Sequence, residues 1–183
     1  MKTKQYLTIL LLLILYSCSN KKKSVLEKTK SDKENIMELK RKCVQEGDIQ
    51  SFDELVLYYS YHEKLEYELL PIAIIMADTY HAKKSYLIVY LSTIKIYNKG
   101  IYSIYNFRNL TSEQKAFALY YLEKGVFSSD SSCILELARL NKYGIGMQKN
   151  IEKSKFYENL YRKKNPSCDF EKKDEYEMKN GIL

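Results

Sequence analysis

At 183 residues and 21.7 kDa, of which 45% are apolar, the chain has room for one domain that buries a core without metal or disulfide support. Six glycines and two prolines leave few tight turns for an architecture of many short strands, so the composition favours helices. The formal net charge is +7, but residues 34–183 carry only +1 of it, which argues against the basic face that a nucleic-acid-binding domain needs.

The N-terminal pattern is typical of an exported lipoprotein. Lys2 and Lys4 precede YLTILLLLILY, an uncharged run that fits a secretory signal and is short for a membrane-spanning helix. The run ends in LYSC, which resembles the lipobox of bacterial lipoproteins, although Tyr16 stands where a small residue is common. The resemblance implies that residues 1–17 are a signal peptide and that Cys18 carries lipid, which anchors the chain in a membrane. A plain signal peptide or an uncleaved anchor is the alternative. No small-x-small cleavage site precedes the charged SNKKK, which favours lipidation.

Residues 18–33 are interpreted as the lipidated cysteine and a lysine-rich tether. Positions 19–33 hold six lysines against two acidic residues, so most of the basic excess lies in this solvated spacer. No acidic pair follows Cys18, whereas surface-exported lipoproteins of some Bacteroidota carry one. By this resemblance we expect a protein of a Bacteroidota-like bacterium on the outer membrane, facing the periplasm.

The rest of the chain predicts a domain of about seven helices over residues 34–164, followed by a charged C-terminal tail over 165–183. Periodic apolar positions and end signals predict helices at about 32–46, with Ser31 and Glu34 at capping-box spacing, and at about 49–61, 64–79, 83–97, 112–124, 131–143 and 151–164. Pro71 must kink the third helix or mark its first turn, and Gly125 is expected to end the fifth. The fourth helix is apolar nearly all round, so we expect it to be central. Residues 98–110 are expected to form a loop.

Internal repetition is visible when helices are aligned on a small residue. Ser51, Ser85 and Cys133 align, each followed by apolar residues four and five positions later. The first offset is 34 residues, a period common in paired-helix repeats, and the second is longer by about the length of the 98–110 loop. The pattern indicates three repeats with one insertion.

The stretch CILELARLNKYGIGMQKNIEKSKFYENL then resembles one unit of the Sel-one-like class of tetratricopeptide-type repeats. The matching positions are Cys133, Leu137, Ala138, Leu140, Tyr143, Gly144, Gly146, Met147, Asn150, Lys153 and Ser154, with Met147 in place of the usual Val and Ser154 in place of the usual Ala. The match is degenerate over residues 34–97, where Gly-x-Gly is missing, so the number of true repeats stays open. The resemblance implies an all-α fold, a right-handed stack of antiparallel helix pairs like a tetratricopeptide solenoid.

The double glycine could instead suggest a phosphate-binding loop. A dinucleotide fingerprint needs a preceding strand and a third glycine, and a P-loop needs Gly-Lys-Ser/Thr, whereas YGIGMQKN has neither. We therefore expect a structural turn, in which Gly144 ends one helix in the left-handed conformation, Gly146 makes a tight connection and Asn150 caps the next helix.

No group of residues predicts catalysis or metal binding. His62 and His81 lie on different predicted elements, so a zinc site is not expected, and Glu63, Glu66 and Glu68 are interpreted as a solvated helix start. We expect no cofactor, no small-molecule substrate and no nucleic acid. Cys43 and Cys133 lie on apolar faces and are interpreted as core residues, while any pairing among Cys43, Cys133 and Cys168 stays open.

A helix stack of this class typically binds peptides or proteins on one face, and tyrosine suits such a surface. The candidates on the first helix of each pair, about half of which we expect to be exposed, are Tyr67, Tyr120, Tyr121, Tyr157 and Tyr161. The tyrosine-rich loop GIYSIYNF is a second possible contact, or simply a lid packed over the repeat junction. The favoured function is a lipid-anchored, non-enzymatic protein-protein interaction module of the cell envelope. The alternatives are a periplasmic immunity lipoprotein that neutralises a secreted toxin, and an enzyme that acts on cell-wall material.

Overall fold

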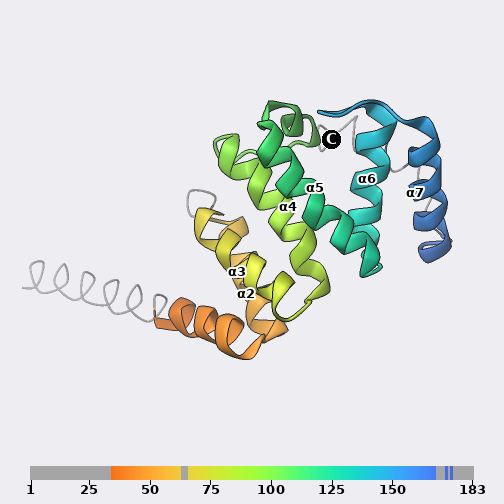
Figure 1. Ribbon diagram of the computed structural model, residues 1–183. Coiled ribbons are helices and arrows are strands. Elements are labelled where there is room, and N and C mark those ends of the chain that lie inside the picture. The colour runs from red at the N-terminus through yellow and green to blue at the C-terminus, as the bar shows by residue number, and fades with distance from the viewer. Residues whose placement is uncertain (1–33, 63–65, 168–171, 173, 175–183) are drawn as a thin grey trace, which may run out of the picture.

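The computed structural model describes residues 34–62, 66–167, 172 and 174, and within them it is entirely helical (Figure 1). The predicted signal peptide, Cys18 and the tether lie outside the described residues. The helices span residues 34–46, α2 (Ile49–Ser60), α3 (Glu66–Asp78), α4 (Lys83–Tyr97), α5 (Ser112–Phe127), α6 (Ser131–Tyr143) and α7 (Ile151–Lys164), with a short 3₁₀ helix, η2 (Ile104–Asn109). The expectation of an all-α chain is thus confirmed.

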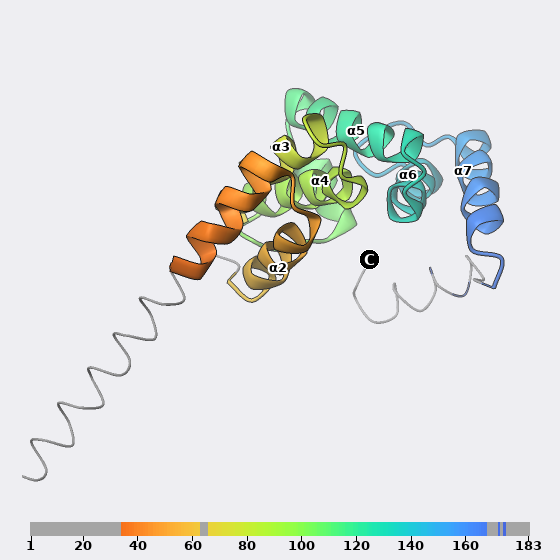
Figure 2. The same ribbon diagram turned by 90° about the horizontal axis from the view of Figure 1, so that it is seen from below.

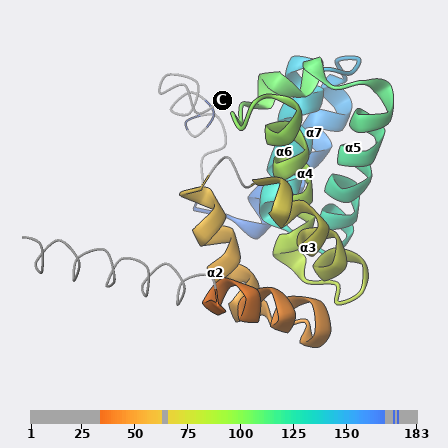
Figure 3. The same cartoon turned by 90° about the vertical axis from the view of Figure 1, so that its left-hand side faces the viewer.

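Helices that follow one another in sequence pack against one another, so the domain is a stack of antiparallel pairs. The most extensive contacts join α3 with α4, α4 with α5, and α6 with α7. The helix of residues 34–46 lies at one end of the stack and α7 at the other (Figures 1 and 2), and Figure 3 views the molecule from the N-terminal end. This arrangement is compatible with a helical-repeat solenoid. In the part of the chain that the structure describes, no helix has the length and apolar character to cross a membrane.

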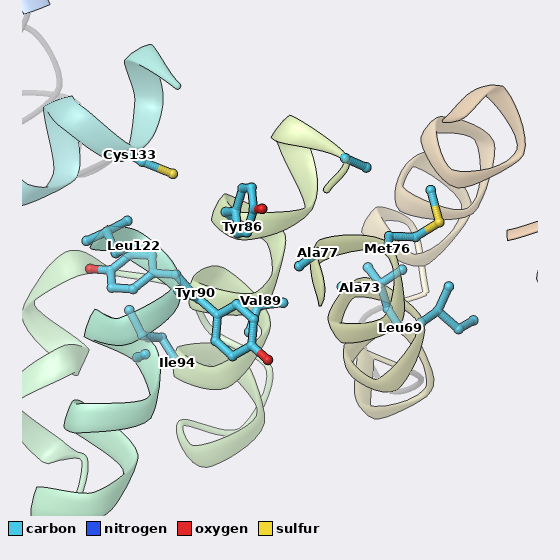
Figure 4. Close-up of a cluster of buried hydrophobic side chains, with 14 of the residues drawn as sticks. Leu69, Ala73, Met76, Ala77, Tyr86, Val89, Tyr90, Ile94, Leu122 and Cys133 are labelled. Carbon is cyan, nitrogen blue, oxygen red and sulfur yellow. The ribbon is translucent and has the colours of Figure 1, made fainter. Parts of the chain in front are cut away.

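Helix α4 is central, as its all-round apolar sequence predicts. Its buried Tyr86, Val89 and Ile94 lie between side chains of α3 and those of α5 and α6 (Figure 4). Leu122 of α5 and Cys133 of α6 are fully buried on one side of it. A helix enclosed on several faces needs mostly apolar residues, because a buried polar side chain loses its hydration unless it finds a partner. The buried Ser85 and Thr93 hydroxyls of α4 donate to the backbone oxygens of Ala82 and Val89.

The three small residues aligned in the sequence occupy equivalent places. Ser51, Ser85 and Cys133 are each the third residue of their helix, α2, α4 and α6, and each is buried. Two of these helices also begin alike, since the Asp48 carboxylate accepts the amide of Ser51 and the Asp130 carboxylate accepts the amide of Cys133. The equivalence supports the internal repetition read from the sequence.

Several predicted helix ends are confirmed by their cap geometry. Thr111 and Gln114 form a reciprocal capping box at the start of α5, and the Asn150 side chain accepts the amide of Lys153 at the start of α7. Gly144 ends α6 with φ 64°, the left-handed conformation that glycine adopts without strain. The structural interpretation of the YGIG corner is therefore confirmed at both of its ends.

Gly125 does not end α5, which continues to Phe127. A Cβ on Gly125 would lie 2.3 Å from Cys133 Sγ, so glycine is needed here for the close approach of α5 and α6. Pro71 likewise lies inside α3 and not at its first turn. Glycine and proline act as helix terminators only where packing does not override them.

The segment 98–110 is a packed insertion and not an open loop. It contains η2, whose Ile104 and Phe107 are buried in the core. Gly146 of the YGIG corner faces Phe107, because a Cβ there would lie 2.7 Å from the Phe107 ring. The insertion and the turn after α6 therefore pack closely against each other.

Candidate functional site

The five candidate tyrosines divide by burial. Tyr67 on α3 and Tyr120 on α5 are 60% and 51% exposed, and Tyr157 on α7 is partly buried. Tyr121 and Tyr161 are buried, with exposures of 4% and 5%, so their rings belong to the core and the expectation that they line a binding surface is corrected. The reason is their place on the helix: Tyr121 faces α3, and Tyr161 packs against Ile134, Leu135 and Ala138 of α6.

An exposed aromatic surface remains on α5, and we call Phe117, Tyr120 and Lys124 the α5 surface. Phe117 is 37% exposed, and Lys124 Nζ lies 4.7 Å from the centre of the Tyr120 ring. The spacing of three and four residues places all three side chains on one side of the helix. Such a surface combines aromatic area with a cationic tip.

The α5 surface is held from beneath by a polar contact to α3. The Tyr121 hydroxyl donates to Asp78 Oδ2 at 2.6 Å, and Lys124 Nζ donates to Asp78 Oδ1 at 2.9 Å. Burial by itself would raise the pKa of Asp78, but these two hydrogen bonds outweigh it, and the pKa lies below its ordinary value. The rings of Phe117 and Tyr120 each make an edge contact with the ring of Tyr121. Contacts within the chain therefore hold the exposed aromatic rings in place.

A second feature, which the sequence does not predict, is a charged cluster on α6. We call it the α6 polar cluster, and its members are Tyr102, Glu136, Arg139, Lys142, Tyr143 and Asp174. Arg139 and Asp174 are almost fully buried, with exposures of 3% and 1%. Charges buried to this degree are rare unless they are paired.

Two oxygens of Asp174 receive the bonds of the cluster. Arg139 Nε donates to Asp174 Oδ1 at 2.8 Å, while Lys142 Nζ and the Tyr143 hydroxyl donate to Oδ2 at 3.1 and 2.9 Å. Burial, and then the hydrogen bond to Asp174, raise the pKa of Tyr143. Asp174 lies within the segment expected to be a charged tail, yet at this position the chain is docked on α6.

Glu136 completes the cluster on its inner side. It accepts Arg139 Nη1 at 3.2 Å and the Tyr102 hydroxyl, from the insertion before η2, at 2.9 Å. Burial and then the charge of Glu136 raise the pKa values of Tyr90 and Tyr102 well above normal, which keeps both hydroxyls protonated. Among the residues that the structure describes, no atom lies in hydrogen-bond geometry with the buried Tyr90 hydroxyl, a state that costs free energy in a packed core.

Sequence reasoning could have found two members of this cluster. Glu136 and Arg139 are three residues apart on a helix whose other buried positions are apolar except Asn141, and a charged pair there is a signal. Asp174 carries no such signal, because its neighbours in the sequence are also charged.

The remaining predicted residues play structural parts where the structure describes them. Glu68 pairs with Lys40 and accepts the Tyr59 hydroxyl at 2.9 Å, so it links α3 to the two helices before it instead of being only solvated. Glu63, the Glu66 side chain and Cys168 lie outside the part of the chain that the structure describes. Cys43 and Cys133 are buried free thiols, and burial raises the pKa of Cys43 to about 11. Groups of three or more potential metal ligands are not found among the described positions.

Comparison of the chain with protein-family models, with curated proteins and with solved structures finds no match. Two features of the molecule bear on its function. One is an exposed aromatic surface suited to contact. The other is a buried cluster that holds a carboxylate.

Proposed function

We propose that the protein is a lipid-anchored, non-enzymatic protein-protein interaction module of the bacterial cell envelope, built on Sel-one-like repeats. Cys18 carries the lipid, residues 19–33 form the tether, and the helix stack faces the periplasm from the outer membrane. The LYSC motif and the lysine-rich composition of the tether support the anchor. The stack of helix pairs supports the binding role, since such folds present extended contact surfaces.

The observation that carries the binding role is the α5 surface. Tyr120 is half exposed although its ring already contacts Tyr121 and Lys124, so its outer side is open and its position is fixed. Rigid aromatic side chains lose little conformational entropy on binding and are enriched among the residues that dominate interfaces. A partner that covers Phe117 and Tyr120 with apolar side chains would gain most of its affinity here.

The test is quantitative capture of envelope proteins by the full chain and by Tyr120→Ala. We expect one stoichiometric partner, with affinity reduced about 30-fold or more by Tyr120→Ala, which corresponds to about 2 kcal/mol at an interface hot spot. Tyr97→Ala is the matched control, because Tyr97 is 56% exposed at the end of α4, outside the α5 surface. Equal capture by the two variants would remove the α5 surface from the proposal.

The anchor has its own test. Labelling of growing cells with a palmitate analogue should mark the unmodified protein and leave Cys18→Ser unmarked, since only a cysteine at this position can take the lipid. Equal labelling of both proteins would contradict lipidation without touching the binding role.

A further inference from the structure

The two ends of the helix stack keep large apolar side chains in contact with solvent. Helix α2, which belongs to the first helix pair, exposes Ile49 and Leu57 by 57% and 59%, and α7 exposes Phe156 by 63%. The terminal helices of a repeat stack usually carry a polar outer face, because no further repeat covers them. Exposed apolar groups at both ends distinguish this stack from one that is closed by polar caps.

On α2 the exposed apolar residues lie beside acidic ones, and we call Ile49, Asp53, Glu54 and Leu57 the α2 surface. Ile49, Asp53 and Leu57 follow one another at intervals of four residues, so they lie on one side of the helix. Among the twelve residues of α2 there is no lysine or arginine. Lys84 of α4 pairs with Asp53, but both side chains stay exposed. The α2 surface therefore combines apolar area with negative charge.

On α7 the exposed aromatic ring lies between lysines, and we call Lys153, Phe156 and Lys163 the α7 surface. Their spacing of three and then seven residues places them on one side of the helix. Both lysines are exposed, and neither makes an ion pair in the described part of the chain. The helix as a whole holds five basic residues against two acidic ones. The α7 surface therefore combines an exposed ring with positive charge.

The α2 and α7 surfaces are complementary, yet they cannot meet within one molecule. They lie toward opposite ends of the stack, with α3, α4, α5 and α6 between them (Figures 1 and 2). Contact between them would bury exposed apolar groups and bring lysines to carboxylates, whereas contact between two α7 surfaces would bring like charges together. Only a second copy of the chain supplies the missing half of such a contact.

We propose that copies of the chain associate head to tail, with the α7 surface of one copy packed on the α2 surface of the next. The two surfaces differ, so the contact is heterologous, and each assembly keeps one free surface of each kind to which a further copy can add. One side of one helix on each partner makes a small interface, of the size found in transient complexes. The inference goes beyond the proposed function and does not depend on it, because neither the α5 surface nor the lipid anchor takes part.

The test is sedimentation equilibrium of the full chain in a density-matched detergent, with many more micelles than protein molecules. The unmodified chain is compared with Leu57→Glu, which places a charge in the apolar part of the α2 surface, and with Phe156→Glu, which does the same on the α7 surface. Both side chains are largely exposed, so neither change disturbs the core. We expect the average mass of the unmodified chain to rise with its concentration, and each variant to associate with itself at least about 30-fold more weakly.

A mixture of the two variants separates a head-to-tail contact from any other. Leu57→Glu keeps its α7 surface and Phe156→Glu keeps its α2 surface, so an equimolar mixture should form a dimer with the affinity of the unmodified contact and no larger assembly. The proposal is overturned if the mixture stays monomeric, if the unmodified chain stays monomeric, or if either variant associates with itself as strongly as the unmodified chain does.

Tyr97→Glu is the matched control, because it makes the same change in net charge at an aromatic residue that is 56% exposed at the end of α4, outside both surfaces. It should associate as the unmodified chain does. Equal weakening by Tyr97→Glu and Phe156→Glu would show a general effect of added negative charge and would also overturn the proposal.

A second measurement needs no disruptive variant. The chain contains no tryptophan, so Phe156→Trp places the only one on the α7 surface and keeps an aromatic ring there. Its emission should shift to shorter wavelength as the protein concentration rises, since the contact removes the ring from water, while the emission of Tyr97→Trp should not shift. Emission of Phe156→Trp that is independent of concentration would contradict the contact. Loss of envelope-protein capture in Tyr120→Ala concerns α5 alone, so the two proposals succeed or fail separately.

Discussion

Asp78 and Asp174 both join distant parts of the described chain, and each accepts a tyrosine hydroxyl and a lysine, as Glu68 does between α3 and the two helices before it. Asp78 links α3 to Tyr121 and Lys124 on α5, and Asp174 links the C-terminal segment to Tyr143 and Lys142 on α6. The partners are the same in kind, but the surroundings differ. The Asp78 side chain is 40% exposed, whereas that of Asp174 is 2% exposed and also meets Arg139.

The difference shows that the burial of a carboxylate determines how much its hydrogen bonds contribute to stability, more than the kind of groups that donate to it. Water can replace the partners of Asp78, so its hydrogen bonds contribute modestly. Around Asp174 no such replacement is available, and loss of one partner leaves a buried charge uncompensated. One contact therefore adjusts the packing of two helices, while the other holds the buried Asp174 on α6.

The largest effect is expected for Arg139→Gln, which leaves Asp174 and Glu136 buried without their guanidinium. We expect a loss of about 3–5 kcal/mol in the free energy of unfolding, measured by urea denaturation. Lys84→Gln, which breaks the exposed pair with Asp53, is the control and should cost less than about 1 kcal/mol. Similar losses in the free energy of unfolding for both variants would mean that burial does not make the Arg139 ion pairs more important for stability than the exposed pair of Lys84 and Asp53.

A smaller effect is expected from removing single hydroxyls. Tyr143→Phe and Tyr121→Phe each delete one donor to a carboxylate, and a hydrogen bond to a charged group contributes about 1.5–3 kcal/mol. Tyr143→Phe should lie near the upper end and Tyr121→Phe near the lower, since solvent reaches Asp78 but not Asp174. If urea denaturation showed a larger loss in the free energy of unfolding for Tyr121→Phe than for Tyr143→Phe, the contrast between Asp78 and Asp174 would be contradicted.

Asp78→Asn should cost still less, about 1 kcal/mol or below, because the amide can still accept from Tyr121 and Lys124 stays solvated. Thermal unfolding would detect the change. If Asp78→Asn lost as much free energy of unfolding as Arg139→Gln, solvent exposure would not explain the small contribution of the contact between α3 and α5.

The smallest effect is a pH dependence. The pKa of Asp78 is lowered in the folded protein, so its contribution is present above the unfolded value, near 3.8, and is lost as the pH falls through the lower folded pKa. The stability difference between the unmodified chain and Asp78→Asn should therefore shrink from pH 5 toward pH 2. A difference that stays constant over this range would contradict the assigned hydrogen bonds.

Much of the fold follows from local signals in the sequence. The capping box at Thr111, the cap at Asn150 and the left-handed Gly144 are short-range features, and they place helix ends within one or two residues. The prediction that Gly125 ends α5 is wrong because the reason for this glycine is not local: it makes room for Cys133 on the next helix.

The candidate site was harder to predict than the helices. Periodicity places Tyr120 and Tyr121 on α5, but neighbouring residues on a helix face different directions, and only the position of α3 decides which one is buried. The α6 polar cluster depends on Asp174, which follows α7 in the sequence. No pattern in that charged part of the sequence predicts that Asp174 contacts Arg139. Tertiary contacts, not propensity, determine both results.

The central claim is that Asp174 is held on α6 by Arg139 and is not part of a solvated tail. A double-mutant cycle with Arg139→Gln, Asp174→Asn and the double variant measures their coupling directly. We predict a coupling energy of about 2 kcal/mol or more, since the two charges meet at 2.8 Å in a buried place. A coupling energy within about 0.5 kcal/mol of zero, the limit for independent sites, would contradict the account.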